Sequence, residues 1–320
     1  MVVDSKFWHF ILKHINRSQP VILLCVLESH GSSPGRQGYK MAVTSEDIYG
    51  SIGGGIMEYK FVEMAKEKLL SNSNDPLIRK QIHNKSAKMN QSGMICSGEQ
   101  TIALFHLSIE HSNAIEKIIN CLENNLYGLL KISSKEFSFL ENENAPFYYF
   151  QMKSEDDWQF EETMGHKNHL YIIGGGHCAL ALSRIMSQMD FYIHLYDDRS
   201  DLNTFIQNTY VKEKKVISDY SLLKDLIPSG THIYTVIMTF GYRTDDIALR
   251  SLIDKDFKYL GVLGSQSKME KMFEEWRKDN LSELKLNKLF APIGVPIHSQ
   301  TPEEIAVSIA AEIISVKNKK

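Results

Sequence analysis

The sequence lacks the features of a disulfide-rich, zinc-binding or membrane-embedded protein. Its 320 residues include only four cysteines, which are far apart and form no CxxC pair: Cys25, Cys96, Cys121 and Cys178. This spacing argues against a disulfide framework and against a structural zinc site. No apolar run approaches the roughly eighteen residues of a membrane span. Residues 1–17 have the amphipathic spacing of a helix and no clean cleavage site, so we expect no secretion signal and a cytoplasmic protein.

An excess of positive charge is also missing. The formal net charge is −3, which gives no support to a role in binding nucleic acid or an anionic membrane surface. A hydrophobic content of 43% and a charged content of 23% describe an ordinary globular protein, long enough for two domains. The function therefore has to be sought in individual motifs.

Residues 169–199 contain the most informative motif. An apolar strand leads into a glycine turn, an apolar-faced helix and a second strand that ends at Asp197 and Asp198. This is the order of a nucleotide-binding βαβ unit, in which Gly174 permits the tight turn and Gly176 lets the backbone approach a phosphate. Either Asp197 or Asp198 could bind a ribose hydroxyl. The alternative is a turn of this shape that serves only packing.

The rest of the second half continues to alternate strands with helices. This pattern predicts a parallel sheet that is covered on both faces. We therefore expect an α/β protein with a C-terminal Rossmann-like parallel-sheet domain, residues 166–320, and a smaller N-terminal mixed α/β domain, residues 1–165. The polar, acidic stretch 153–168 is expected to be loose and to contain the boundary between them.

Two glycine-rich segments suggest a phosphate site in the first half. The segment HGSSPGRQG offers side-chain donors from Ser32, Ser33 and Arg36. A second segment places a glycine triplet between a predicted strand and a predicted helix: Gly53, Gly54 and Gly55. A triplet in this place presents several backbone N–H groups in one concavity, which suits phosphate. The alternative is that both segments only turn corners.

Cys96 stands between glycines in GMICSG, directly before a predicted strand. As a thiolate it would be a soft metal ligand. No histidine or second cysteine stands at ligand spacing, so we expect no metal cage built from protein alone, while a bond to the metal of a cofactor remains open. The alternative is a small buried hydrophobe, the interpretation that we keep for Cys25 in an apolar strand and for Cys121 and Cys178 in helices.

Other candidate residues lie in the second half. Ser265 is expected to cap a helix that has Lys268 in its first turn, where a cation is unfavourable unless an anion is bound. This suggests a second phosphate contact. Thr301 and Glu304 have the spacing of a capping box. His177 follows the glycine turn and could be functional or simply a polar loop residue, and no nucleophile–base arrangement is visible.

Three ordered blocks resemble the xanthine dehydrogenase accessory family, the XdhC/CoxI-like proteins. The blocks are GSSP followed by GSIGGG and Glu58, then GMICSG, then a C-terminal run from IIGGGHCALAL through YDDR and GVLGSQSK. The resemblance implies a chaperone of the molybdenum cofactor (molybdopterin), a pterin dithiolene that carries a phosphate. Such a protein protects the cofactor while a cysteine desulfurase adds sulfur, then inserts it into xanthine dehydrogenase or a related molybdenum hydroxylase. The resemblance also assigns the cofactor-linked cysteine to Cys96 and implies a homodimer.

Some positions depart from the family pattern. Many members have a cysteine where this chain has Ile56, and a THDH-like element where it has the segment 239–242. Cys96 is therefore the only thiol that matches a motif. The βαβ unit could hold the pterin, a dinucleotide form of the cofactor, or no ligand. The alternative function is an NAD(P)-dependent oxidoreductase that uses this unit.

Overall fold

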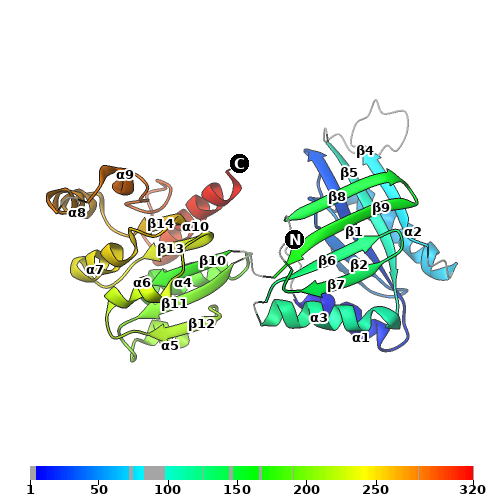
Figure 1. The fold of residues 1–320 in the computed structure, drawn as a ribbon, viewed down its shortest axis with the longest axis horizontal. Coiled ribbons are helices and arrows are strands. Elements are labelled where there is room, and N and C mark those ends of the chain that lie inside the picture. Colours follow the sequence, from blue (N-terminus) through cyan, green and yellow to red (C-terminus); the bar gives the residue numbers. More distant parts are fainter. Residues whose placement is uncertain are drawn as a thin grey trace. The chain divides into compact units, whose positions relative to one another are not determined.

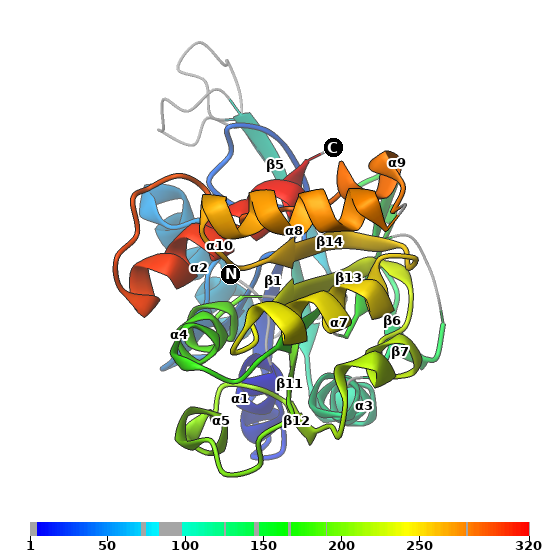
Figure 2. The ribbon, with the colours of Figure 1, turned by 90° about the vertical axis from the view of Figure 1, so that its left-hand side faces the viewer.

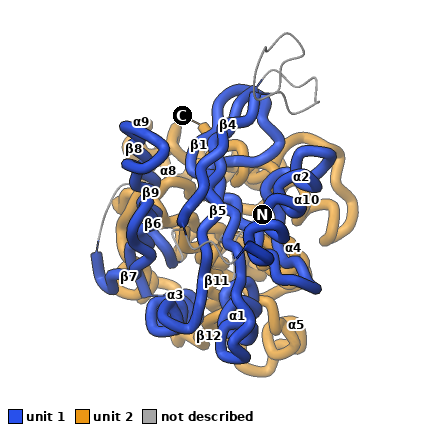
Figure 3. Tube along the Cα trace, turned by 90° about the vertical axis from the view of Figure 1, so that its right-hand side faces the viewer, with its two compact units in different colours: residues 1–165 blue, residues 166–320 orange. Residues whose placement is uncertain are grey.

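The computed structural model describes residues 5–71, 75–82, 98–124, 126–143, 147–165, 168–189, 191–279 and 281–319. The chain divides into two compact units, Met1–Gly165 and His166–Lys320 (Figure 3). The N-terminal unit is slightly the longer of the two, although the sequence led us to expect the smaller domain there. Each unit has its own buried apolar clusters. Among the helices that the structure describes, none is long and apolar enough to cross a membrane.

The N-terminal unit contains two antiparallel sheets (Figure 1). The first has the strand order β3-β2-β1-β5-β4 and the second has the order β7-β6-β9-β8. The strands are β1 (Val21–Gly31), β2 (Lys40–Val43), β3 (Ile48–Gly50), β4 (Leu77–Ile82), β5 (Gly98–Leu107), β6 (Gly128–Ser133), β7 (Phe137–Glu141), β8 (Tyr148–Ser154) and β9 (Asp157–Met164).

The first sheet is covered on both faces. Helix α2 (Gly55–Leu70) packs on one face, and the second sheet with helices α1 (Ser5–Ile15) and α3 (Ser112–Glu123) packs on the other. The central strand β1 is consequently buried along most of its length. This explains its uninterrupted apolar sequence, since a strand buried on both faces needs no alternation.

The stretch 153–168 is not the loose linker that its charge suggested. Half of it forms β9, which pairs with β6 and β8, and its first two residues end β8. Trp158, Phe160 and Met164 are buried in the core, and the buried Glu162 lies on the same side of the strand, while Asp157, Gln159 and Glu161 alternate with them. The alternation is clear over residues 157–161, but the buried carboxylate of Glu162 interrupts the apolar face and concealed the strand. The chain passes into the second unit after Gly165.

The C-terminal unit is built on a parallel sheet with the strand order β12-β11-β10-β13-β14. Helices α4 and α10 pack on one face and α7 and α8 on the other (Figure 2). This confirms the predicted Rossmann-like sheet. The elements are β10 (His169–Ile173), α4 (His177–Met186), β11 (Tyr192–Asp197), α5 (Asn203–Gln207), β12 (Glu213–Val216), α6 (Leu223–Leu226), β13 (Gly230–Ile237), α7 (Tyr242–Leu252), β14 (Phe257–Val262), α8 (Gln266–Lys278), α9 (Glu283–Leu286) and α10 (Pro302–Asn318).

The direction of winding reverses between β10 and β13. From β10 the chain builds outward through β11 to β12, then returns to the other side of β10 and adds β13 and β14. In open α/β sheets, ligands bind beyond the carboxyl ends of the strands at such a reversal. The turn that follows β10 therefore stands where a ligand is expected.

Candidate functional site

The two glycine-rich segments of the N-terminal unit pack against each other. A Cβ on Gly35 would lie 2.0 Å from the carbonyl oxygen of Ile52, and a Cβ on Gly53 would lie 2.5 Å from the backbone nitrogen of Gly35. Only hydrogens fit at these two positions. The structure therefore brings together the two loops that the sequence singled out separately.

The polar side chains of the first loop differ in availability. The Ser33 hydroxyl is buried and donates to the carbonyl oxygen of Gly35 at 2.7 Å, so it stabilises the loop from within. Ser32 and Arg36 are exposed. One guanidinium nitrogen of Arg36 donates to the Gly31 carbonyl at 3.0 Å, which holds the cation at the edge of the loop.

The second loop is closed by a carboxylate from its own helix. Glu58 Oε2 accepts hydrogen bonds from the backbone nitrogens of Ile52 and Gly54, both at 2.9 Å, and from the Ser51 hydroxyl at 2.6 Å. Gly54 and Gly55 have φ values of 77° and 72°, and no side chain caps the start of α2. The Glu58 carboxylate, in the first turn of α2, therefore already occupies part of the concavity, and an external anion would have only the remaining N–H groups and would be repelled by this charge.

Cys96 lies outside the described residues. Strand β5 begins two positions later, at Gly98, where it pairs with Gly31, and a Cβ on Gly98 would lie 2.5 Å from the Ser33 nitrogen. The start of β5 therefore lies beside the first glycine-rich loop. Within the described ranges, no cluster of three acidic, histidine or cysteine side chains could hold a metal ion.

The other cysteines are poor candidates for a metal-binding thiolate. Burial raises the pKa of both Cys25 and Cys121 to about 12, so each stays protonated near neutral pH. Burial also raises the pKa of Cys178, which lies in α4 as predicted. Cys25 in β1 and Cys121 in α3 are buried, as the hydrophobic interpretation requires, whereas Cys178 in α4 is only half-buried.

In the C-terminal unit, the predicted glycine turn connects β10 to α4. Gly174 has a φ of 106°, and a Cβ there would lie 2.3 Å from the carbonyl oxygen of Met238, just after β13. Gly176 precedes α4, which has no side-chain cap, and among the described residues no atom lies within 4 Å of the position of its Cβ. Gly174 thus serves close packing, whereas Gly176 faces open space.

Asp197 ends β11 as predicted, but its carboxylate is engaged within the protein. It is fully buried and accepts hydrogen bonds from the Gly175 nitrogen at 2.6 Å and from the backbone and guanidinium of Arg199. Burial alone would raise the pKa of Asp197, yet these hydrogen bonds hold it below its usual value. Asp198 is more exposed and accepts a hydrogen bond from Tyr220 at 3.0 Å. Binding a ribose hydroxyl through Asp197 would require it to exchange one of these partners.

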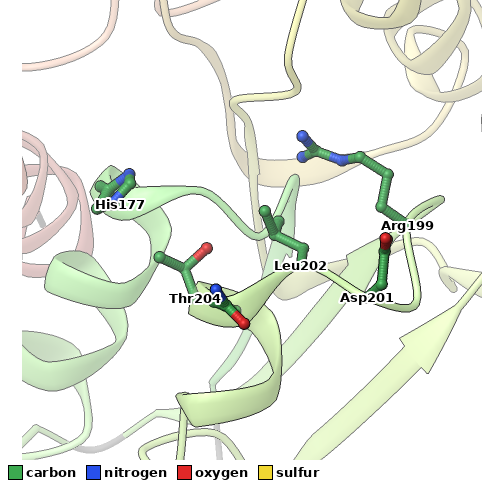
Figure 4. Close-up of a pocket in the computed structure, with 6 residues that line it drawn as sticks. His177, Arg199, Asp201, Leu202 and Thr204 are labelled. Carbon is green, nitrogen blue, oxygen red and sulfur yellow. The ribbon is translucent and has the colours of Figure 1, made fainter.

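A pocket of about 350 Å³ lies beside this turn. Figure 4 shows His177 at the start of α4 on one side and Arg199 on the other, with Leu202 and Thr204 between them. Asp201 and Asn203 complete the lining. The Thr204 hydroxyl donates to the Gly175 carbonyl at 2.6 Å, which ties α5 to the glycine turn. Sequence reasoning selected His177 but not Arg199, although Arg199 follows the acidic pair directly.

Ser265 caps α8 as predicted, through a hydrogen bond from the Lys268 nitrogen at 3.2 Å. The ammonium of Lys268 has an internal partner, the fully buried carboxylate of Asp245. That carboxylate also accepts from the Thr239 backbone nitrogen at 2.9 Å. Lys268 is thus neutralised by Asp245, a residue that sequence reasoning missed because an acid in the first turn of α7 is unremarkable.

Both units are similar to known proteins. Residues 14–79 match the sequence model described as the XdhC and CoxI family, and residues 170–313 match that of the XdhC Rossmann domain. The uncharacterized Escherichia coli protein YqeB is 23% identical over 302 residues, which are 93% of this chain and 44% of YqeB. The chain therefore spans less than half the length of that relative.

Two further proteins extend the match. A Bacillus subtilis protein described as a probable subunit of xanthine dehydrogenase is 23% identical over 248 residues, which are 71% of this chain and 72% of that protein. A crystal structure described as a xanthine dehydrogenase from Bacillus halodurans has a TM-score of 0.73 and 19% identity. That match covers 99% of this chain and 97% of the other, so the two share a fold along their length.

Proposed function

Because this chain belongs to the XdhC and CoxI family, we propose that it is an accessory protein that carries the molybdenum cofactor to a molybdenum hydroxylase. The cofactor is its cargo, and the client is an enzyme of the xanthine dehydrogenase type, as the descriptions of the Bacillus relatives suggest. A cysteine desulfurase, a homodimeric state and a cytoplasmic location belong to the same proposal.

The packing of the two glycine-rich loops is the observation that supports this proposal best. It places the exposed Arg36 on one loop and the uncapped start of α2 on the other at one end of the first sheet. A helix start and a guanidinium are both suited to a phosphate monoester. These groups suit the phosphate of molybdopterin, while the Glu58 carboxylate, which uses two of the loop N–H groups, opposes an anion at the same place.

We assign the bond to the metal to Cys96. Cys96 precedes Gly98 by two positions in the sequence, and Gly98 is paired with the base of the first glycine-rich loop. A thiolate is a ligand that suits a soft metal centre, and Cys25, Cys121 and Cys178 have raised pKa values. In this proposal the loops hold the phosphate, Cys96 holds the metal, and the protein releases both to the client enzyme.

A Cys96→Ser variant tests this assignment. We expect it to fold normally and to lose retention of the molybdenum cofactor through gel filtration, because a serine hydroxyl is not a soft ligand. Cys178→Ser, which removes a cysteine from the other unit, is the matched control and should retain the cofactor. If Cys96→Ser retains the cofactor as the unchanged protein does, the thiolate assignment is wrong.

The alternative, an NAD(P)-dependent oxidoreductase, draws support only from the pocket of the C-terminal unit. It predicts saturable consumption of NADPH or NADH by the purified protein with a carbonyl or quinone acceptor. The accessory role predicts cofactor transfer without such turnover.

A further inference from the structure

The hydrogen bonds that Asp197 already makes affect which nucleotide the C-terminal unit can bind. In dinucleotide-binding βαβ units, an acid at the end of the second strand binds the ribose hydroxyls, whereas a nearby arginine accommodates a 2′-phosphate. Here the acid is present, but three donors from Arg199 and one from Gly175 already occupy its two oxygens. Asp197 is fully buried, so a ribose hydroxyl could bind it only by displacing one of these four donors.

Arg199, unlike Asp197, keeps a hydrogen-bonding group available for a ligand. Its Nε and Nη2 atoms bind Asp197, while in the part of the chain that the structure describes Nη1 has no hydrogen-bond partner. About a third of the side chain is exposed, and it lines the pocket (Figure 4). The hydrogen bonds to Asp197 also fix the orientation of the guanidinium plane. Arg199 is therefore a preoriented donor at the position where the ribose of a bound nucleotide is expected.

Groups next to the lining residues His177 and Arg199 suit the rest of a nucleotide. The uncapped start of α4 and the open space at Gly176 accommodate a 5′-phosphate or pyrophosphate. The Phe240 ring, 88% exposed in the loop after β13, has the Arg199 guanidinium carbon 5.6 Å from its centroid. Nucleobases stack on aromatic rings and on guanidinium planes.

Acidic groups also face this site. Asp197 pairs directly with the Arg199 guanidinium, Asp198 lies 3.7 Å from it and Asp201 lines the pocket, so all three weaken the attraction for a phosphate. Asp198 is drawn toward Tyr220, which leaves Asp201 as the carboxylate in the pocket lining. Neutralising Asp201 should therefore strengthen phosphate binding, an effect opposite in sign to the loss of Arg199.

We infer that this pocket binds a nucleotide whose ribose carries a 2′-phosphate, as in NADPH, and that Arg199 binds this phosphate. The inference goes beyond the proposed function and is independent of it, since it concerns nucleotide binding with no molybdenum cofactor present. It reverses the preference that an acid at the end of β11 indicates from sequence alone.

The test is to titrate the full-length protein with NADPH, NADH and adenosine 2′,5′-bisphosphate by calorimetry. We expect NADPH to bind at least about tenfold more tightly than NADH, as one charge-assisted hydrogen-bonding contact provides. Adenosine 2′,5′-bisphosphate should compete with NADPH, while adenosine 5′-monophosphate should compete poorly. Equal affinities, tighter binding of NADH, or no binding of either nucleotide at millimolar concentration would overturn the inference.

Three variants separate the role of Arg199 from a general effect of charge. Arg199→Lys keeps a cation beside buried Asp197 but lacks the planar fork, so the preference for NADPH should fall severalfold. Asp201→Asn, at an exposed position, should raise the affinity for NADPH and leave that for NADH nearly unchanged. Arg184→Ala removes an exposed arginine from the last turn of α4 and is the matched control. If Arg199→Lys does not fold, Asp201→Asn becomes the test of the inference. An unchanged ratio of the NADPH and NADH affinities in Asp201→Asn would contradict it.

Discussion

Carboxylates hold the glycine-rich turns and neighbouring loops of both units in place. Glu58 accepts from Gly54, Asp197 from Gly175, and Asp245 from Thr239, each through a backbone N–H group. Hydrogen bonds from N–H groups to a charged acceptor are stronger than neutral ones. At the scale of the residue, an acid beside a glycine turn is therefore part of the turn, and an external phosphate is left with the remaining N–H groups and with the start of the following helix.

His194 is buried and belongs to a hydrogen-bonded chain that makes stability depend on pH. Its Nδ1 lies 2.8 Å from Glu213 Oε2 and its Nε2 lies 2.9 Å from Nδ1 of His169. Because the carboxylate accepts, neutral His194 donates through Nδ1 and accepts from His169 through Nε2. Burial lowers the pKa of His194 below its ordinary value of 6.5, against the opposing effect of Glu213.

The free energy of unfolding should therefore fall as the pH falls below 6.5. In this range the unfolded chain takes up a proton on His194 while the folded protein does not, so acid favours the unfolded state. Urea unfolding at pH 7.5 and pH 5.5 measures the slope, which should be shallower in His194→Gln. His177→Gln, a change at an exposed histidine, is the control. A slope that His194→Gln leaves unchanged would contradict this prediction.

At the scale of the element, the turn between β10 and α4 contains one glycine that packing requires, Gly174, and one that packing does not require, Gly176. Gly174→Ala should destabilise the protein by about 2 kcal/mol or more, because it combines an unfavourable φ with an impossible contact to the Met238 carbonyl. Gly176→Ala meets open space and has a φ of −70°, so it should cost less than about 0.5 kcal/mol. Chemical denaturation of the two variants gives this comparison. Equal losses would show that the two positions are not distinguished by packing.

Helix starts were predictable because their determinants are local. Thr301 and Glu304 form the expected capping box at the start of α10, and Ser265 caps α8. The burial of β9 was not predictable in the same way. Its inward residues join a core cluster with residues of α1, β1 and α3, which are distant in sequence, and the buried Glu162 interrupts the apolar alternation.

At the scale of the whole molecule, a buried ion pair joins the two sheets of the N-terminal unit. Lys40 on β2 is fully buried and binds Glu162 on β9, which is 6% exposed. Burial disfavours the charge of Lys40, but the neighbouring carboxylate raises its pKa above the usual value. The Lys40 ammonium also donates to the Gly38 carbonyl at 3.0 Å, at the end of the first glycine-rich loop.

Lys40→Met should destabilise the N-terminal unit by about 3–5 kcal/mol, since it leaves Glu162 buried without its partner. Because each unit has separate apolar clusters, calorimetry should show two transitions, of which only the N-terminal one shifts. Lys131→Met removes the partially exposed pair with Glu161 and should cost less than about 1 kcal/mol. A common shift of both transitions would mean that the two units unfold together.

The sequence alone determined the features that depend on neighbouring residues. These are the alternation of strands and helices in the C-terminal unit, the glycine turns, the helix caps and the motifs that mark the family. Tertiary structure decided which polar groups remain available to a ligand. Gly35 meets Ile52, Lys268 meets Asp245 and Asp197 meets the Gly175 nitrogen only after the chain has folded. A motif specifies which groups are present, but their partners come from other elements, and a buried charge must find such a partner.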